Sequence, residues 1–220
     1  MLCVVTDSIA AGEVAPVPAP SKGERLTAAA CELVYRQGVA RTTLADIAQA
    51  ANMLVGNVYY YFKTKDDIVA AIVHMHAHQL TSALTALEHR HRSPRTRLKA
   101  LVGDLAERRE AIAEHGCRYG TLGSELAKRA AGPDPLAALL MQIPIDWAEQ
   151  QFRAMGRRDA HDLAIDLVAS YQGSAVLSHA LGQPELMTRQ ARRLQRWIDV
   201  LATPTQRPAR STGERPTQHD

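Results

Sequence analysis

Residues 41–65 read RTTLADIAQAANMLVGNVYYYFKTK, and this stretch decides the fold prediction. Apolar spacing predicts a short helix over residues 44–51, and Asn52 tolerates the left-handed conformation that ends it. A second short helix is predicted over residues 55–62. Two short helices joined by a tight turn form a helix-turn-helix, whose second helix enters the major groove of DNA. The stretch therefore predicts a DNA-binding segment.

The side chains of the second helix suit contact with DNA. Gly56 has no Cβ, so the backbone can approach a base pair closely. Asn57 offers a donor and an acceptor to a base edge. Tyr59, Tyr60 and Tyr61 are consecutive, so a helix points them about 100° apart and at least one must be exposed.

Positive charge gathers around this segment. Between residues 22 and 65 there are six Lys and Arg against three Asp and Glu, so this part alone carries the net charge of +3 of the whole chain. Thr64 is predicted to cap a long helix that starts near Lys65. Lys63 and Lys65 add charge at a helix start, where free N–H groups already favour a phosphate.

The segment resembles the DNA-binding domain of TetR-family regulators over about 45 residues. The shared positions are Gly38, Thr42, Thr43, Ile47, Ala48, Gly56, Tyr59, Tyr61, Phe62 and Lys65. The run from Gly56 to Asp66 resembles the branch with QacR-like and LmrA-like drug-responsive repressors. The resemblance implies base contacts from Val55, Gly56, Asn57 and Tyr60. It implies phosphate contacts from Thr42, Tyr59, Lys63 and Lys65, with Tyr61 and Phe62 mainly packing.

Two departures from the family pattern concern the turn. The pattern usually has Gly-Val-Ser, whereas this chain has Asn52, Met53 and Leu54. Leu54 would offer an apolar contact, such as one with a thymine methyl group, in place of a hydrogen bond. Val55 replaces a common polar residue in the same way. We therefore expect an atypical operator, and we include Thr43 and Leu54 among the DNA-contacting residues.

Composition indicates an ordinary globular protein. The chain has 220 residues, of which 46% are hydrophobic and 22% charged. Its three cysteines have no zinc spacing, so we expect neither a metal nor a disulfide framework, and the pattern is typical of a reducing cytoplasm. No run of 18 apolar residues is present, which argues against a membrane partner. No cofactor motif is recognised.

The remaining pattern predicts an all-α protein of about nine helices without strands. We expect a disordered leader over 1–21, a helix-turn-helix domain over 22–66, a helical ligand-binding and dimerisation domain over 67–203, and a disordered tail over 204–220. One helix is expected from Ser93 to about Glu114. Gly116, Gly120 and Gly123 are expected to mark a loop after it.

The larger domain is predicted to bind a small apolar or aromatic effector. Its candidate pocket residues are His74, His78, Tyr119, Trp147, Phe152, Tyr171 and His179. The alternative for each of them is a plain core position. The resemblance also implies a homodimer through the last two long helices. Two recognition helices would then read a palindromic operator with half-sites about 34–36 Å apart or a multiple of that.

Metal binding, redox sensing, catalysis and non-specific DNA binding remain open. His74 and His78 are four residues apart, as metal ligands can be, but no third ligand is evident. Cys117 lies near His115 and Arg118, which would favour a thiolate and a redox-responsive regulator. A small helical enzyme would need an activated nucleophile, and no such motif is found. A non-specific architectural protein would bind scrambled DNA equally well.

Overall fold

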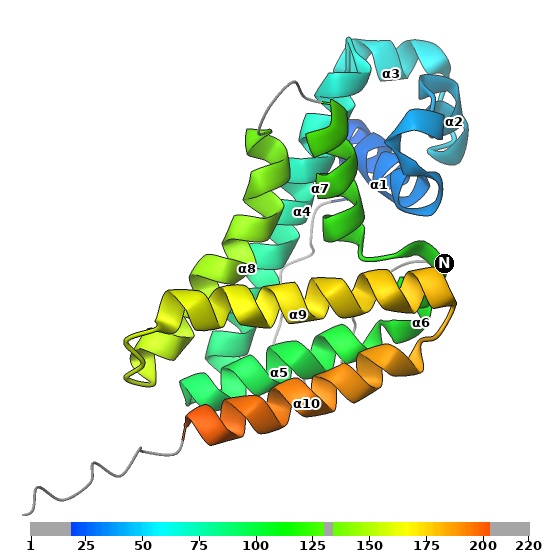
Figure 1. The fold of residues 1–220 in the computed structure, drawn as a ribbon. Helices are drawn as coiled ribbons and strands as arrows, with labels where there is room; N and C mark the ends of the chain where they lie inside the picture. Colours follow the sequence, from blue (N-terminus) through cyan, green and yellow to red (C-terminus); the bar gives the residue numbers. More distant parts are fainter. Residues whose placement is uncertain (1–18, 130–133, 203–220) are drawn as a thin grey trace, which may run out of the picture.

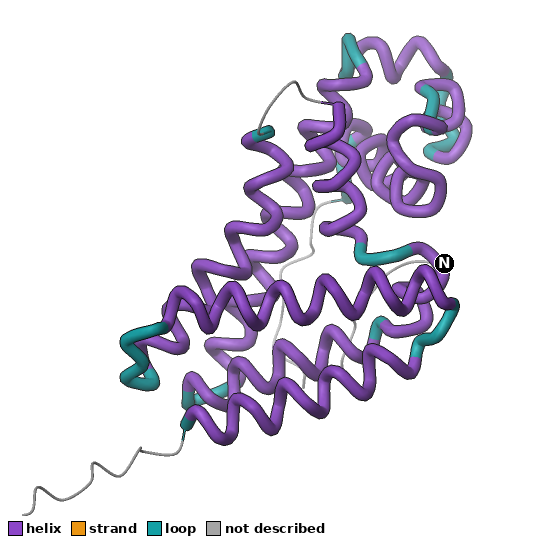
Figure 2. The backbone as a smooth tube through the Cα atoms, in the orientation of Figure 1, coloured by secondary structure: helices purple, strands orange, loops and turns teal. Residues whose placement is uncertain are grey.

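The computed structural model describes residues 19–129 and 134–202, and within them the chain is helical without strands (Figure 2). This confirms the all-α prediction. The helices are α1 (Lys22–Arg41), α2 (Leu44–Ala50), α3 (Val55–Tyr61), α4 (Lys65–Arg90), α5 (Pro94–Glu107), α6 (Arg109–His115), α7 (Arg118–Arg129), α8 (Pro135–Ala154), α9 (Ala160–Leu181) and α10 (Glu185–Leu201). No helix among the described residues is both long enough and apolar enough to cross a membrane.

The helices form two packed regions joined by α4. Helices α1 to α3 gather at one end of the molecule, and α4 runs from them toward α5, α9 and α10 (Figure 1). One apolar core holds α1 to α3 against the first half of α4, α7 and the start of α8. A second core lies between the last turns of α4 and helices α5, α8, α9 and α10. Tyr119 packs against both cores.

Local sequence explains the helix starts of the first region. Ser21, Thr43 and Thr64 each form a capping box with an acid three residues later. Such a box satisfies free N–H groups at the helix start. The predicted starts at residues 44 and 65 are confirmed. Because Ser21 caps α1, ordered structure begins inside the stretch predicted as a leader. The rest of that leader before residue 19 and the tail over 204–220 lie outside the described residues.

Two glycines of the predicted loop lie inside α7, so that expectation was wrong for them. Gly116, with a φ of 80°, does end α6, but Gly120 and Gly123 are helical. A Cβ at position 123 would lie 3.5 Å from the carbonyl oxygen of Ala137 in α8. That distance is an ordinary contact, whereas a Cβ at position 120 would overlap the side chain of Gln172 in α9, so a glycine at position 120 leaves room for Gln172 although local propensity disfavours it in a helix.

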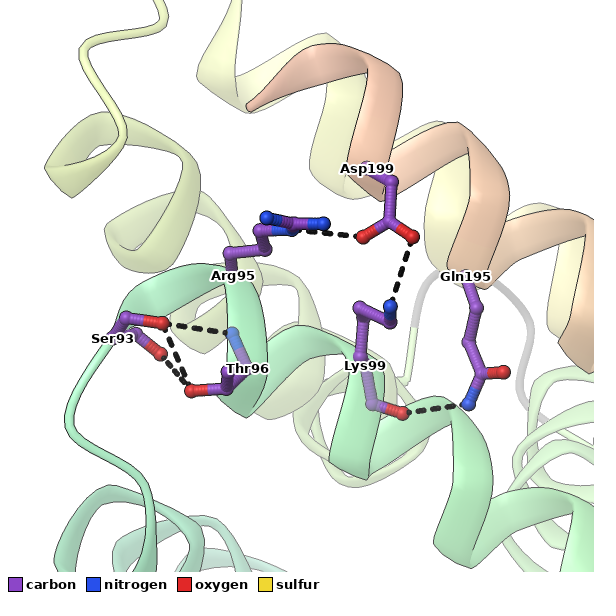
Figure 3. Close-up of polar contacts among 6 residues, drawn as sticks. All are labelled: Ser93, Arg95, Thr96, Lys99, Gln195 and Asp199. Atoms are coloured by element: carbon purple, nitrogen blue, oxygen red, sulfur yellow. Dashed lines mark hydrogen bonds and ion pairs between the residues drawn. The ribbon is translucent and has the colours of Figure 1, made fainter. Parts of the chain in front are cut away.

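The helix expected from Ser93 to Glu114 is divided at Arg108 into α5 and α6, which accounts for ten helices among the described residues instead of about nine. Helix α5 lies beside α10 (Figure 1). Asp199 of α10 accepts hydrogen bonds from Arg95 Nε at 2.8 Å and from Lys99 Nζ at 2.9 Å (Figure 3). These partly exposed ion pairs stabilise the helix pair only modestly.

Candidate DNA interface and effector cavity

The turn between α2 and α3 has the geometry of a helix-turn-helix. Asn52 adopts a φ of 53°, the left-handed conformation expected for it. The backbone N–H of Met53 donates to the carbonyl oxygen of Ala48 at 2.9 Å, which closes the end of α2. Val58 of α3 is fully buried in the first core. Because Val58 faces inward, the opposite side of α3 is directed away from the rest of the molecule.

That outer side of α3 and its first residues form an exposed surface that we call the α3 head. Its large side chains are Leu54, Val55, Tyr59, Tyr60 and Tyr61, with Leu54 80% and Tyr60 75% exposed. Gly56 lies one turn before Tyr60 on the same side, and a Cβ there would meet nothing within 4 Å. The backbone at Gly56 is therefore open to a partner. Asn57 beside it is half-buried.

Two lysines follow the α3 head. Lys63 Nζ donates to the carbonyl oxygen of Tyr59 at 3.1 Å, and Lys65 Nζ donates to that of Ala40 at 3.2 Å. Both bonds are exposed, so a phosphate oxygen can replace the carbonyl at little cost. Thr43 is also exposed, and its hydroxyl accepts the Asp46 N–H that starts α2.

Thr42 departs from the predicted set. Its side chain is only 2% exposed, and its hydroxyl donates to the carbonyl oxygen of Gly38 at 2.8 Å. The hydroxyl is therefore used in closing the end of α1 and does not present itself to a phosphate. Tyr61, expected mainly to pack, is 41% exposed, although its ring also lies against Gly23.

Helix α7 makes polar contacts with α1 and α4 that were not predicted from the sequence. The Glu125 carboxylate accepts the backbone N–H of Val39 at 2.7 Å, where Gly38 bends α1 with a φ of 82°. At the end of α7, Arg129 pairs with Asp66 of α4 at 2.6 Å. The signal in the sequence was weak, because an acid on a helix surface does not reveal a distant backbone partner.

His76 was also missed. It is 3% exposed, and its Nε2 lies 3.7 Å from Cys31 Sγ, whereas His74 and His78 are more accessible. Burial lowers the pKa of His76 to about 4, with a smaller effect of Arg118, and burial raises the pKa of Cys31 to about 12. His76 is thus neutral at neutral pH.

An apolar cavity of about 50 Å³ lies in the larger region. Its walls come from α4, α5, α7, α8, α9 and α10. Four polar side chains reach it, namely Tyr119, Tyr171, Gln172 and Gln190, and no charged residue of the described chain is among its lining residues. Burial raises the pKa of Tyr171, so its hydroxyl stays protonated, and it donates to Cys117 Sγ at 3.7 Å.

The predicted effector residues separate into three groups. Tyr119 and Tyr171 line the cavity. Trp147 and Phe152 belong to the second core instead, and Trp147 Nε1 donates to Glu88 Oε1 at 2.9 Å. The remaining three, His74, His78 and His179, do not line it, and His179 Nδ1 lies 3.1 Å from the carbonyl oxygen of Ala113.

No group of three or more potential His, Cys, Asp or Glu metal ligands occurs in the part of the chain that the structure describes. His74 and His78 in particular have no third ligand there.

The position of His74 and His78 outside the cavity has a simple cause. Helical spacing places His74 and His78 on one side of α4, but only packing shows which side is buried, and the buried side carries His76 between Ile72 and Leu80.

Sequence comparison identifies the first region. Residues 26–72 match the family described as "Bacterial regulatory proteins, tetR family". The HTH-type transcriptional regulator TtgR of Pseudomonas putida is 49% identical over 39 residues, which are 18% of this chain and 19% of that protein. The match thus spans about a fifth of that relative's length. An uncharacterized HTH-type transcriptional regulator in the lacX 3′ region of Lactococcus lactis subsp. lactis is 27% identical over 165 residues, or 70% of this chain and 81% of that one.

Structural comparison extends the likeness to the whole described fold. A TetR transcriptional regulator from Legionella pneumophila superposes with a TM-score of 0.72 at 18% identity, covering 84% of this chain and 98% of that chain. At this identity the superposition concerns the fold alone. Assignment to the QacR-like and LmrA-like branch stays a prediction. Residues 26–72 are thus similar to the DNA-binding segment of the tetR family of bacterial regulatory proteins, and the described fold is similar to that of a TetR regulator.

Proposed function

We propose that the protein is a transcriptional repressor that binds a palindromic operator as a homodimer and is released by a small uncharged apolar or aromatic effector. The observation that carries this proposal is the α3 head, which exposes Gly56 and Tyr60 beside Lys63 and Lys65. The cationic side chains of Lys63 and Lys65, which we call the cationic rim, support binding to phosphates. The exposed side of α3 supports contact with base edges.

The DNA-contacting set that we propose is Thr43, Leu54, Val55, Gly56, Asn57, Tyr59, Tyr60, Lys63 and Lys65. Gly56 and Asn57 would meet base edges, because the outer side of α3 is the side that enters a major groove. Tyr59, Lys63 and Lys65 would hold the phosphates. Thr42 is left out because its hydroxyl is buried.

Exposed aliphatic side chains on α9 and α10 support a dimer. Ile165, Val176, Leu177, Leu181 and Val200 are each more than 40% exposed. We call these residues together the α9–α10 face. An apolar surface on two packed helices is typical of an interface between copies. The exposed arginines of α10 would border that interface or remain solvated.

The cavity supports an effector without charge. Apolar walls favour an apolar body, and the hydroxyl and amide groups of Tyr119, Tyr171 and Gln172 could each make one directional hydrogen bond. A charged group would lose its hydration without an opposite charge to replace it.

The size of the cavity supports a coupled conformational change. At about 50 Å³ it is smaller than the about 150 Å³ interior cavity that holds benzene in an engineered protein. An effector would therefore bind a state in which the lining helices have moved apart. Operator would bind the other state, so each ligand would shift the population away from the other.

The test is selection of duplexes from a random-sequence library by the full chain, followed by binding measurements on the enriched sequence. We expect specific enrichment of a two-fold symmetric site. Asn57→Ala should alter the preferred base at one position in each half-site without abolishing binding. Equal binding to scrambled DNA would support a non-specific architectural protein and refute the repressor.

Redox control and catalysis gain little support from the structure. Cys117 is 6% exposed, whereas reactive thiols are usually accessible, so redox control by Cys117 stays a hypothesis. A helical enzyme acting on the effector would show turnover of the bound compound. Location in the cytoplasm remains a prediction from composition.

A further inference from the structure

Leu54 has the most exposed large apolar side chain among the described residues, at 80%. It is the residue that caps the start of α3, and its side chain makes no capping hydrogen bond. Serine, threonine, aspartate and asparagine are favoured at such a position because their oxygen satisfies a free N–H group. Leucine therefore weakens the local helix and also leaves apolar surface in water. Neither effect is explained by packing within the chain.

The neighbours of Leu54 show where this side chain lies in the proposed complex. Val55 follows it and is 41% exposed, and Gly56 leaves open space beside its backbone. The first residues of a recognition helix are those that contact base edges in a helix-turn-helix complex. Lys63 and Lys65 near the other end of α3 match the charge of a phosphate backbone. Duplex DNA is thus the partner that the apolar side chains of Leu54 and Val55 at the start of α3 would contact.

The major groove offers few apolar groups. Its edges present hydrogen-bond donors and acceptors, together with the C5-methyl group of thymine. We infer that Leu54, assisted by Val55, selects the half-site by contact with a thymine C5-methyl group. This inference rests on the proposed function, because it requires that α3 enters the groove.

Methyl recognition has a chemical consequence beyond thymine. 5-Methylcytosine carries a methyl group at the same ring position, facing the same groove. A site in which the contacted thymine is replaced by cytosine should therefore recover part of its affinity when that cytosine is methylated. Deoxyuridine differs from thymidine only in lacking this methyl group, so it isolates the contact without changing base pairing.

The experiment uses the duplex enriched from the random library, resynthesised with deoxyuridine at each thymine position in turn. Affinity of the full chain is measured by fluorescence anisotropy at one salt concentration. We expect one or two positions in each half-site at which deoxyuridine weakens binding about fourfold, the effect of uncovering one methyl-sized group. Restoring the methyl group as 5-methylcytosine in a C·G pair should recover part of the loss caused by cytosine.

Two variants assign the contact to Leu54. Leu54→Ser removes the apolar side chain and supplies a good helix cap, so it should fold and bind with equal affinity to thymine and deoxyuridine duplexes. Leu54→Met keeps an apolar side chain and should retain the discrimination. A wild-type chain that binds its enriched site equally well with and without thymine methyl groups would overturn the inference but not the proposed function. Failure to enrich any sequence would instead overturn the proposed function, and the inference with it.

Discussion

The α3 head and the α9–α10 face both expose large apolar side chains, yet their surroundings differ. The α3 head carries three tyrosine hydroxyls and is followed by Lys63 and Lys65. The α9–α10 face is aliphatic and includes Val176, Leu177 and Leu181. Exposed apolar area alone therefore does not identify a partner. The α9–α10 face also has cations near it, since Leu177 lines a pocket with Arg189 and Arg193, but its large exposed side chains are aliphatic and carry no hydroxyl, which favours a second copy as the partner.

The largest expected effect comes from a charge on the aliphatic surface. Leu177→Asp should convert the dimer to a monomer and weaken operator binding by about 100-fold or more, because the two half-site contacts lose their linkage. Leu177 is 54% exposed, so the monomer should keep its fold. Sedimentation and anisotropy measure the two effects, with circular dichroism as the check on folding.

The matched control for this variant is Leu54→Asp. It should abolish DNA binding by repulsion from phosphates while the chain remains a dimer. If Leu177→Asp stayed dimeric, or if Leu54→Asp dissociated the dimer, the assignment of the two surfaces would be wrong.

The next effect concerns His76, which lies between the two regions. Burial lowers the pKa of His76 in the folded chain to about 4. In the unfolded chain His76 is protonated below about pH 6.5, whereas in the folded chain it stays neutral down to about pH 4. The contribution of His76 to the free energy of unfolding should be complete above pH 6.5. It should fall by about 1.4 kcal/mol per pH unit as the pH drops toward 4, a loss of about 3 kcal/mol in total.

Urea unfolding at about pH 7, 5.5 and 4.5, which spans the window between the two pKa values, measures this loss. The variant His76→Gln, which cannot take up a proton, should lack this part of the pH dependence, and His74→Gln should behave like the wild type. An equally steep fall in His76→Gln would assign acid sensitivity to other groups.

A smaller effect is expected from the cationic rim of the α3 head. Lys65→Ala should weaken binding to all sequences by about tenfold and reduce the slope of log affinity against log salt by about one unit per protomer. The control Arg158→Ala changes an exposed cation between α8 and α9, and we expect no change in slope. An unchanged slope in Lys65→Ala would refute the proposed docking.

The smallest expected effect on stability comes from Gly56→Ala, a variant that should change stability and DNA binding in opposite directions. Gly56→Ala should raise the unfolding free energy by about 0.5–1 kcal/mol, since alanine favours a helix and the space is open. The same variant should weaken DNA binding, because the added methyl group stands on the outer side of α3. Thermal unfolding and anisotropy measure the two changes.

Gly38→Ala provides the contrast to Gly56→Ala. Its φ of 82° is strained for alanine, and its Cβ would lie 2.8 Å from Glu125 Oε1, so we expect a loss of about 1–3 kcal/mol. Equal stability of the two glycine variants would contradict the bend seen in α1.

Prediction from the sequence succeeded where the determinants are local. The caps at Thr43 and Thr64 and the turn at Asn52 depend on neighbouring residues in the chain. The exposure of the α3 head follows from three consecutive tyrosines on a helix. Prediction failed for Gly120 and Gly123, which lie in α7 next to Gln172 of α9 and Ala137 of α8, because a pattern of neighbouring residues does not show such contacts.

The proposed effector site shows the same limit. Tyr119 and Tyr171 were expected in the cavity and line it, but Trp147 and Phe152 lie in the core, and His76 replaces its neighbours as the buried histidine. Helical spacing tells which residues share a side of a helix. It does not tell which side meets another helix, because that depends on how all the helices pack.

The sequence by itself determined the helical class, the helix-turn-helix and the residues that α3 presents, since caps, turns and periodicity are properties of neighbouring residues. Only the tertiary structure decided the cavity, the buried Thr42 and the contact of Glu125 with Val39. Glu125 and Val39 are 86 positions apart in the chain. Such contacts arise from packing of the whole chain, which no local pattern encodes.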